Sequence, residues 1–423
     1  MTRNDSYSTS LRARLLGMTA LTGLVAATTA FPTSDAQASG FALKEQSASA
    51  QGNSFAGATA GAEDVTYMFF NPAGLTRQEE SQASVVLSYV IPTTETNDAT
   101  DLSGSLPGAS SQDGGVSAAI PALYGLWSLS SDLKFGVSVN VPFGMSTEYD
   151  PFWQGAFHAL KSEIKSVNIN PAIAYRVNDM ISLGAGLQVQ HLEATLTSFD
   201  GVGTLEVTGD DWGFGFNLGA LIEFSPETRL GLNYRSQVAH TLDGTATVPS
   251  SGLTDIGVTA DLTTPDTASI GLYHDLSADF AVMAEVAWTG WSSFDQYQVV
   301  TDAGPVLGTT PENWNDVFFY GVGATWKPNQ DWTIRGGVAF DESPIPDAYR
   351  TPRLPGSDRT WLSIGAQFRP SANFTVDAGY SHIFMKEAVV DLAPGYSTPA
   401  LPGFQATYDN SVDIIAVSGT FRF

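Results

Sequence analysis

The sequence predicts an all-β fold, a fourteen-stranded antiparallel transmembrane β-barrel with an N-terminal hatch inside its lumen. Two observations predict the barrel. Apolar residues alternate with small or polar residues along many short runs, and six short polar turns recur between such runs at intervals of roughly fifty residues. The turns occupy residues 130–132, 177–179, 225–227, 277–279, 328–331 and 370–373. Short turns at one membrane surface and longer loops at the other are typical of outer-membrane barrels.

An aromatic residue lies within four residues before each turn, at the depth where a barrel meets the membrane surface. These residues are Trp127, Tyr175, Phe224, Tyr273, Trp326 and Phe368. Two strands around each of the six turns make twelve, and residues 82–93 and 410–423 add one at each end. The even total of fourteen predicts that both termini lie in the periplasm. The aromatic last residue, Phe423, resembles the assembly signal of outer-membrane proteins.

The alternation shows which side chains face lipid. Its clearest example runs from Trp212 to Phe224, with glycine or asparagine at several of the intervening positions. The apolar residues expected to face outward in the first and third strands are Val85, Leu87, Tyr89, Ile91, Phe135, Val137, Val139 and Val141. Apolar residues outside and small or polar residues inside are the arrangement of a membrane barrel.

The residues before the first strand divide into two segments. Residues 1–38 are typical of a secretory signal, with early arginines, an apolar stretch over 15–30 and the small-residue pattern at 36–38, so we expect the mature chain to begin at Ser39. Residues 39–81 are rich in Ser, Ala and Gly and lack alternation. A barrel of fourteen strands is too wide to be filled by its own side chains, so we expect this segment to fill the lumen and residues 82–423 to form the barrel. The alternative is a flexible periplasmic tail, which apolar residues such as Phe41 and Met68 disfavour.

Composition excludes several classes of function. A net charge of −25 with only 19 basic residues disfavours nucleic-acid binding. The absence of cysteine excludes disulfides and thiolate metal sites, and the five histidines lack metal-ligand spacing. Because no nucleophile elbow or phosphate loop is present either, we expect no catalytic site, no metal and no cofactor.

Three parts of the chain resemble a known family, the FadL-type outer-membrane transporters. They are the start Ser39-Gly40-Phe41, the triplet Asn71-Pro72-Ala73 and the run 314–384, within which "DWTIRGGVAFDESPIP" (331–346) and "LPGSDRTWLSIGAQF" (354–368) are especially similar. The resemblance implies a hatch-closed barrel that imports long-chain fatty acids or, in some members, aromatic or other hydrocarbons. It also implies capture on apolar outer loops, a pocket beside the hatch, and sideways release into the bilayer through a kinked third strand.

The resemblance carries over to particular residues. Phe41 is similar to the hatch N-terminus beside the pocket, and Asn71, Pro72 and Ala73 are similar to the hatch motif. The third strand is expected from Leu133 to about Pro142, but the family has no sharp motif that places the kink.

The loop after the third strand is the predicted capture surface, because burying a methylene there contributes about 0.8 kcal/mol. Its apolar candidates are Phe143, Met145, Tyr149, Phe152, Trp153, Phe157 and Leu160. A short helix over 151–161 would place Trp153, Phe157 and Leu160 on one face. The alternative is that this face only packs the loop onto its neighbours.

Strand parity points Arg235, Arg335 and Arg359 into the lumen, where a guanidinium can bind a fatty-acid carboxylate. The alternative is an ion-pair network between hatch and wall, which the inward acids Glu285, Asp341 and Asp377 would complete. His191 and Glu193 lie where relatives can present basic groups to the ligand. A carboxylate there disfavours an anion and leaves room for an uncharged substrate.

The predicted partners are a long-chain fatty acid or another hydrophobic small molecule, together with outer-membrane lipid and lipopolysaccharide, which divalent cations can bridge to the acidic loops. We expect a monomer in the bacterial outer membrane. Two other hypotheses remain open: a general diffusion porin, which needs an open lumen, and a surface enzyme or adhesin anchored by the barrel.

Overall fold

The computed structural model describes residues 40–423, so the predicted signal segment 1–38 and the expected start Ser39 lie outside the described residues. The first eleven strand segments are β1 (Gln82–Asp101), β2 (Gln112–Asp113), β3 (Ala118–Ser128), β4 (Leu133–Asn140), β5 (Gly144–Glu148), β6 (Lys161–Arg176), β7 (Ile181–Phe199), β8 (Thr204–Glu223), β9 (Thr228–Arg235), β10 (Val238–Val248) and β11 (Leu253–Thr264). The others are β12 (Thr267–Asp275), β13 (Phe280–Thr289), β14 (Gln296–Thr301), β15 (Val306–Pro311), β16 (Val317–Trp326), β17 (Trp332–Asp341), β18 (Arg359–Ser371), β19 (Phe374–Met385), β20 (Ala388–Leu392) and β21 (Phe404–Arg422).

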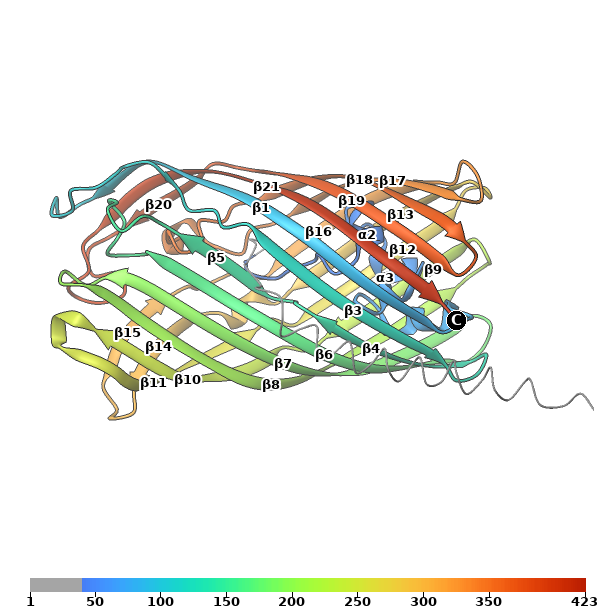
Figure 1. Ribbon diagram of the computed structural model, residues 1–423, viewed down its shortest axis with the longest axis horizontal. Helices are drawn as coiled ribbons and strands as arrows, with labels where there is room; N and C mark the ends of the chain where they lie inside the picture. Colours follow the sequence, from blue (N-terminus) through green and yellow to red (C-terminus); the bar gives the residue numbers. More distant parts are fainter. Residues whose placement is uncertain (1–39) are drawn as a thin grey trace, which may run out of the picture.

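These segments form one antiparallel sheet that closes on itself (Figure 1), because β21 pairs with both β19 and β1. Seven strands are broken into two segments, so the 21 segments make the fourteen strands that the sequence predicts. Several strands run further than expected. β1 continues to Asp101 and β21 begins at Phe404, because these strands extend beyond the apolar belt into the outer part of the molecule.

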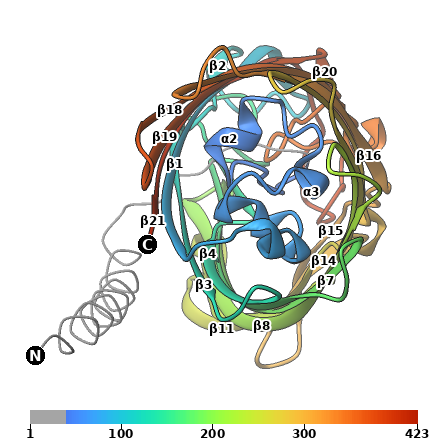
Figure 2. The same cartoon turned by 90° about the vertical axis from the view of Figure 1, so that its right-hand side faces the viewer.

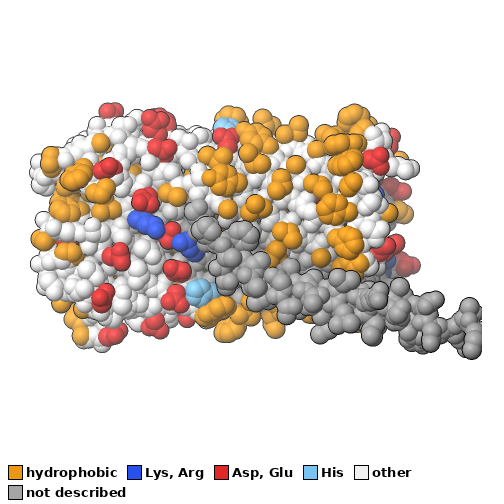
Figure 3. All heavy atoms as spheres, in the orientation of Figure 1, with side chains coloured by type: hydrophobic (Ala, Val, Ile, Leu, Met, Phe, Trp, Pro, Cys, Tyr) orange, Lys and Arg blue, Asp and Glu red, His pale blue; other side chains and the backbone are white. Residues whose placement is uncertain are grey.

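The outward face carries a broad apolar belt, which Figure 3 shows over the right-hand part of the molecule, while acidic side chains gather over the outer part to its left. The predicted outward residues of the first strand are exposed there, as are Phe214 and Ile364. One expectation about orientation is wrong: Val141 is buried because the third strand bends there. Tyr273 lies on the inward face of β12, opposite the exposed Ile270 and Leu272, and its ring packs against the Arg229 guanidinium, 3.6 Å away. Among residues 40–423, no helix is long and apolar enough to cross a bilayer.

The hatch lies inside the barrel (Figure 2). Its helical turns are α2 (Ala48–Gln51), α3 (Ala58–Gly61), η1 (Val65–Phe69) and η2 (Pro72–Arg77), and the barrel has short 3-10 turns at η3 (Pro249–Ser251), η4 (Trp291–Ser293) and η5 (Asp347–Tyr349). Glycines let the wall approach it closely: a Cβ at Gly231 would overlap the Thr59 carbonyl oxygen, and one at Gly337 would overlap that of Asn53.

Hydrogen bonds and ion pairs attach the hatch to the wall. The Arg335 guanidinium reaches Glu63 of the hatch at 2.6 Å and Asp377 of β19 at 2.8 Å. Asn71 caps η2 by accepting from the Ala73 amide at 3.0 Å, and its own amide donates to the carbonyls of Thr59 (2.7 Å) and Ala220 (3.0 Å). The hatch motif therefore both starts a helical turn and joins that turn to β8.

Candidate functional site

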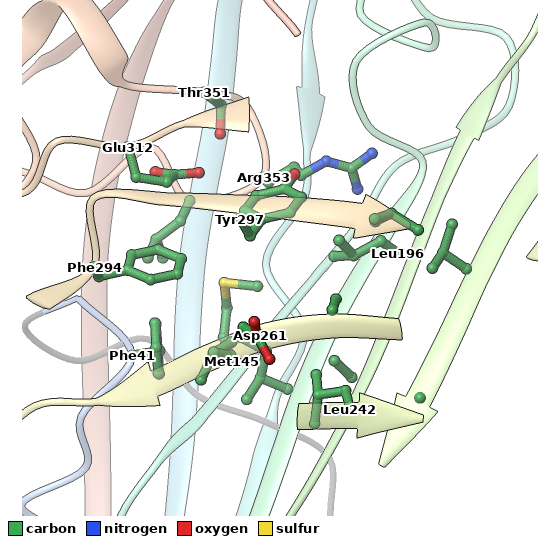
Figure 4. Close-up of a pocket in the computed structure, with 18 of the residues that line it drawn as sticks. Phe41, Met145, Leu196, Leu242, Asp261, Phe294, Tyr297, Glu312, Thr351 and Arg353 are labelled. Atoms are coloured by element: carbon green, nitrogen blue, oxygen red, sulfur yellow. The ribbon is translucent and has the colours of Figure 1, made fainter. Parts of the chain in front are cut away.

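An apolar cavity of about 90 Å³ lies between the hatch and the outer loops (Figure 4). Most of its wall is aliphatic or aromatic and comes from inward-facing positions of β5 to β8, β10, β11 and β14, with loops supplying the rest. The main lining residues are Phe41, Met145, Ile164, Leu196, Leu242, Val258, Leu262, Phe294, Tyr297, Val299, Glu312, Trp314, Ile345, Thr351, Arg353 and Leu354. A lining of this kind suits a hydrophobic molecule with one polar end.

Phe41 closes the inner end of this cavity. Its side chain is 1% exposed, and its ring centroid lies 4.7 Å from Trp291, 5.7 Å from Phe294, 5.8 Å from Trp314 and 5.9 Å from Phe143. We call these five residues the aromatic cluster. Ring pairs at these distances attract one another, so the cluster packs stably at this end of the cavity.

The opposite end of the apolar cavity is polar, as Figure 4 shows for Glu312, Thr351 and Arg353. Burial raises the pKa of Glu312 to about 8, and the Trp314 indole N–H, which donates to its carboxylate at 2.8 Å, lowers that pKa only in part. The carboxyl group is therefore mostly neutral at pH 7.

Arg353 supplies the positive charge at this end. Its Nη1 donates to the Ser162 hydroxyl at 2.9 Å and to the Thr197 carbonyl at 3.2 Å. Over residues 40–423, no carboxylate pairs with it. A fixed guanidinium beside an apolar cavity can bind the headgroup of an anionic amphiphile.

An outer groove of about 390 Å³ adjoins the apolar cavity, and Leu196, Val207, Tyr297, Val299, Thr351 and Arg353 line both. Its other walls include Phe157 and Phe199, whose rings lie 5.4 Å apart, and the segment 396–402. The outer groove is the more polar of the two, so it is suited to first contact from water.

A third cavity, of about 100 Å³, lies beside the hatch and is called the hatch cavity below. Hatch residues Ala42, Lys44, Phe55, Thr59, Phe69 and Phe70 line it, together with Pro142, Phe143, Asn233, Arg235, Glu285 and Phe319 of the barrel. Because Phe41 lines the apolar cavity while Ala42 lines the hatch cavity, the aromatic cluster lies between the two.

The barrel wall is interrupted next to the hatch cavity. β3 pairs with β4 as far as Leu123 with Val139, and the next bridge between these two strands joins Gly115 to Thr147 in the same register. Between them, residues 141–143 bend away from β3. On the opposite side of the bend, the Ser166 hydroxyl of β6 accepts from the Phe143 amide at 2.9 Å and donates to its carbonyl at 2.7 Å, which keeps the bend attached to β6. We call the stretch over which these two strands do not pair with each other, residues 116–122 and 140–146, the wall gap; residues 118–122 still pair with β1, and residues 144–146 still pair with β6.

The start of the hatch is hydrogen-bonded to the bend. The Gly144 amide donates to the Phe41 carbonyl and the Leu43 amide to the Pro142 carbonyl, both at 2.8 Å. The Gln46 amide side chain donates to the Val141 carbonyl at 2.7 Å. A displacement of Phe41 therefore disturbs the edge of the wall gap.

Half of the ten predicted substrate-binding residues line one of these cavities. Phe41 and Met145 line the apolar cavity, Phe143 and Arg235 line the hatch cavity, and Phe157 lines the outer groove. The others line none of these three cavities: Phe152, Trp153, Leu160, Arg335 and Arg359.

The contacts of these last five residues explain why they line no cavity. Phe152 points to solvent at 78% exposure, while Trp153 is fully buried and stacks on Tyr149 at 4.2 Å. The predicted helix over 151–161 is wrong, since these residues form turns in which the Trp153 indole N–H donates to the Ala159 carbonyl at 2.9 Å. Arg335 makes the hatch-to-wall ion pairs that were the alternative, and Arg359 is buried opposite Asp341. Substrate binding by any of these ten residues stays a prediction.

Sequence reasoning missed the residues that the loop 342–358 brings into the apolar cavity. The Thr147 hydroxyl donates to the Arg353 carbonyl at 2.9 Å and the Tyr149 hydroxyl to the Pro352 carbonyl at 2.8 Å, which holds this loop inside the barrel. The available signal was the alternation of proline with apolar residues over 344–355, which suits a rigid buried loop better than a solvated one.

A family model described as "Outer membrane protein transport protein (OMPP1/FadL/TodX)" matches residues 29–423. The chain is 31% identical to an outer membrane protein of Neisseria meningitidis serogroup B, covering 93% of this chain and 97% of that protein. It is 25% identical to the long-chain fatty acid transport protein of Escherichia coli K12, over 88% of this chain and 93% of that protein.

Solved structures share the fold. A FadL homologue of Pseudomonas aeruginosa superposes with a TM-score of 0.85 at 23% identity, covering 90% of this chain and 99% of that one. The toluene transporter TodX of Pseudomonas putida gives a TM-score of 0.66 at 16% identity over the same shares.

Proposed function

Because the chain belongs to the outer membrane protein transport family of FadL and TodX, and so takes up hydrophobic molecules across the bacterial outer membrane, we propose that its substrate is a long-chain fatty acid. The ligand enters the outer groove, moves into the apolar cavity and leaves sideways through the wall gap. One observation carries the proposal: the residue that closes the apolar cavity, Phe41, is hydrogen-bonded to the edge of the wall gap.

Arg353 supports an acid as the substrate. In the apolar cavity the hydrocarbon tail is removed from water, at about 0.8 kcal/mol per methylene. The carboxylate then pairs with Arg353 at the polar end, where the largely neutral Glu312 does not repel it. With the headgroup at this end, the tail points toward the aromatic cluster and leads the way through the wall gap.

Release into the bilayer, rather than into the periplasm, is supported by the hatch. Its residues are almost all buried against the wall, and Arg335, Asn71 and Arg229 make bonds that join it to three different strands, β17, β8 and β9. Moving Phe41 and its immediate neighbours requires only local rearrangement, whereas opening a path below requires withdrawal of the whole hatch. Local opening is therefore the less costly route.

An aromatic hydrocarbon is the second candidate, and the size of the apolar cavity favours it. About 90 Å³ is below the roughly 150 Å³ of a protein cavity that binds one benzene, so a single ring needs slight widening of the cavity, whereas a long tail needs the aromatic cluster to move. Such a ligand would make no use of Arg353.

The monomer and its lipid surroundings belong to the same proposal. The sheet closes on itself through the pairing of β1 with β21, the hatch is hydrogen-bonded to the edge at the wall gap, and one chain encloses all three cavities, which supports a monomer. We expect lipopolysaccharide around the outer part, where divalent cations can bridge its phosphates to the acidic loops.

Binding measurements with the purified protein test the substrate. Oleate, oleyl alcohol and toluene are compared in the wild type and in Arg353→Met. We expect oleate affinity to fall about tenfold in the variant, since a hydrogen bond to a charged group contributes at that level, and affinity for the two neutral ligands to stay unchanged. Tight toluene binding with no oleate binding would replace the fatty acid by the aromatic candidate.

A further inference from the structure

The hatch cavity contains more positive charge than the barrel neutralises. Arg235 is 6% exposed, and its guanidinium donates to the Gln188 side chain at 2.6 Å and the Phe69 carbonyl at 2.9 Å, both neutral groups. No carboxylate among residues 40–423 lies within ion-pair distance of it. A buried cation without a counter-ion is costly, so such a site favours an anionic occupant.

Lys44 adds a second cation to the same cavity. Its ammonium group lies 4.3 Å from the centre of the Phe319 ring, and no hydrogen bond or ion pair involves it within the described part of the chain. The chain has only 19 basic residues in total, so two of them in one small cavity without paired acids is a specific arrangement.

The one acid that lines the hatch cavity is engaged elsewhere. Glu285 accepts hydrogen bonds from the backbone amide of Thr59, at 3.2 Å, and from its hydroxyl group. It therefore holds the hatch. Lys44 attracts this carboxylate electrostatically, but no ion pair joins Glu285 to Lys44 or Arg235 in the described part of the chain. Arg335 shows the contrast, because that buried arginine is paired with two carboxylates.

We propose that the hatch cavity is a second binding site for an anionic headgroup, where Arg235 and Lys44 hold a carboxylate during its exit. The inference rests on the proposed function. A tail that leads through the wall gap draws its carboxylate past the aromatic cluster, away from Arg353 and into a low-dielectric passage. Pro142 and Phe143 belong to the bend in the third strand and also line the hatch cavity, so the two cations meet the headgroup beside the exit.

Uptake by cells that lack their own fatty-acid transporter tests this inference. Lys44→Met, Arg235→Met and the charge-retaining Lys44→Arg are compared for initial uptake of labelled oleate and oleyl alcohol, with equilibrium oleate binding measured on the purified proteins. Lys134→Met is the matched control, because Lys134 also points inward from the wall but lines none of the cavities.

We expect the two charge-removing variants to lower oleate uptake about tenfold, with oleyl alcohol uptake within about twofold of wild type because the alcohol has no charge for Lys44 and Arg235 to hold. Equilibrium oleate binding, to which the headgroup site at Arg353 also contributes, should fall less than uptake does. Lys44→Arg and Lys134→Met should behave as wild type. Equal loss of both ligands, or no loss of oleate in either charge-removing variant, would overturn the inference. Failure of the proposed function is distinguishable, since Arg353→Met would then leave oleate binding unchanged whatever the hatch-cavity variants do.

Discussion

Replacing Phe41 by alanine tests whether the aromatic cluster closes the passage between the apolar cavity and the hatch cavity. The ring is 1% exposed and lies within 6 Å of four other aromatic rings. Truncating a buried phenylalanine costs about 3–5 kcal/mol. The substitution destabilises only the closed state, in which the Phe41 ring packs in the aromatic cluster, because in the open state the ring has already left the cluster. At about 3 kcal/mol, the equilibrium shifts toward the open state roughly one-hundredfold.

Two measurements on Phe41→Ala separate binding from passage. Equilibrium affinity for oleate should fall, because Phe41 is part of the cavity wall. Uptake per bound ligand should rise, because the barrier is lower. Met68→Ala is the matched control: Met68 is a buried hatch residue on the face toward Leu75 and Tyr124, and it lines none of the three cavities.

The reasoning is refuted if uptake per bound ligand stays the same or falls in Phe41→Ala while the protein remains folded. It is also refuted if Met68→Ala produces the same rise. In that case general loosening of the hatch, and not the aromatic cluster, would control the passage.

The hatch, the ionisation of Glu312 and the pair Phe157 and Trp153 each give a further testable prediction. Deleting residues 40–80 should produce large, steady conductance in planar bilayers, since the hatch fills the lumen, and a deletion variant that folds and stays silent contradicts this. Because the pKa of Glu312 is raised to about 8, its carboxyl group ionises as pH rises through 8 and then repels a carboxylate ligand, so oleate affinity should fall between pH 7 and 9. Glu312→Gln should remove that fall, whereas an unchanged pH profile would exclude Glu312 as its cause. Phe157→Ser should weaken uptake at low oleate concentration without lowering the melting temperature, because Phe157 lines the outer groove. Trp153→Ser empties a fully buried site, so it should destabilise the protein by about 3–5 kcal/mol. Equal stability of the two variants would contradict this prediction.

The arrangement of the barrel was predictable because its causes are local. A strand in a membrane wall must alternate apolar and polar residues with period two. The spacing of Phe214, Phe216 and Leu218 therefore indicates, within five residues, that these side chains face lipid. The same parity correctly places Arg235, Arg335 and Arg359 in the lumen. Parity fails at Val141, where the strand bends and the Gln46 side chain of the hatch donates to the Val141 carbonyl.

The sequence by itself determined the barrel, its strand number and the small-residue hatch, because lipid on one side and a narrow lumen on the other restrict each position separately. Only the tertiary structure decided which side chains form the cavities. An apolar residue in a loop can pack or line a site with equal chemistry, so Trp153 and Phe157 could not be told apart beforehand. Arg353 enters the apolar cavity because hydrogen bonds from Thr147 and Tyr149, some two hundred residues away, hold its loop inside the barrel.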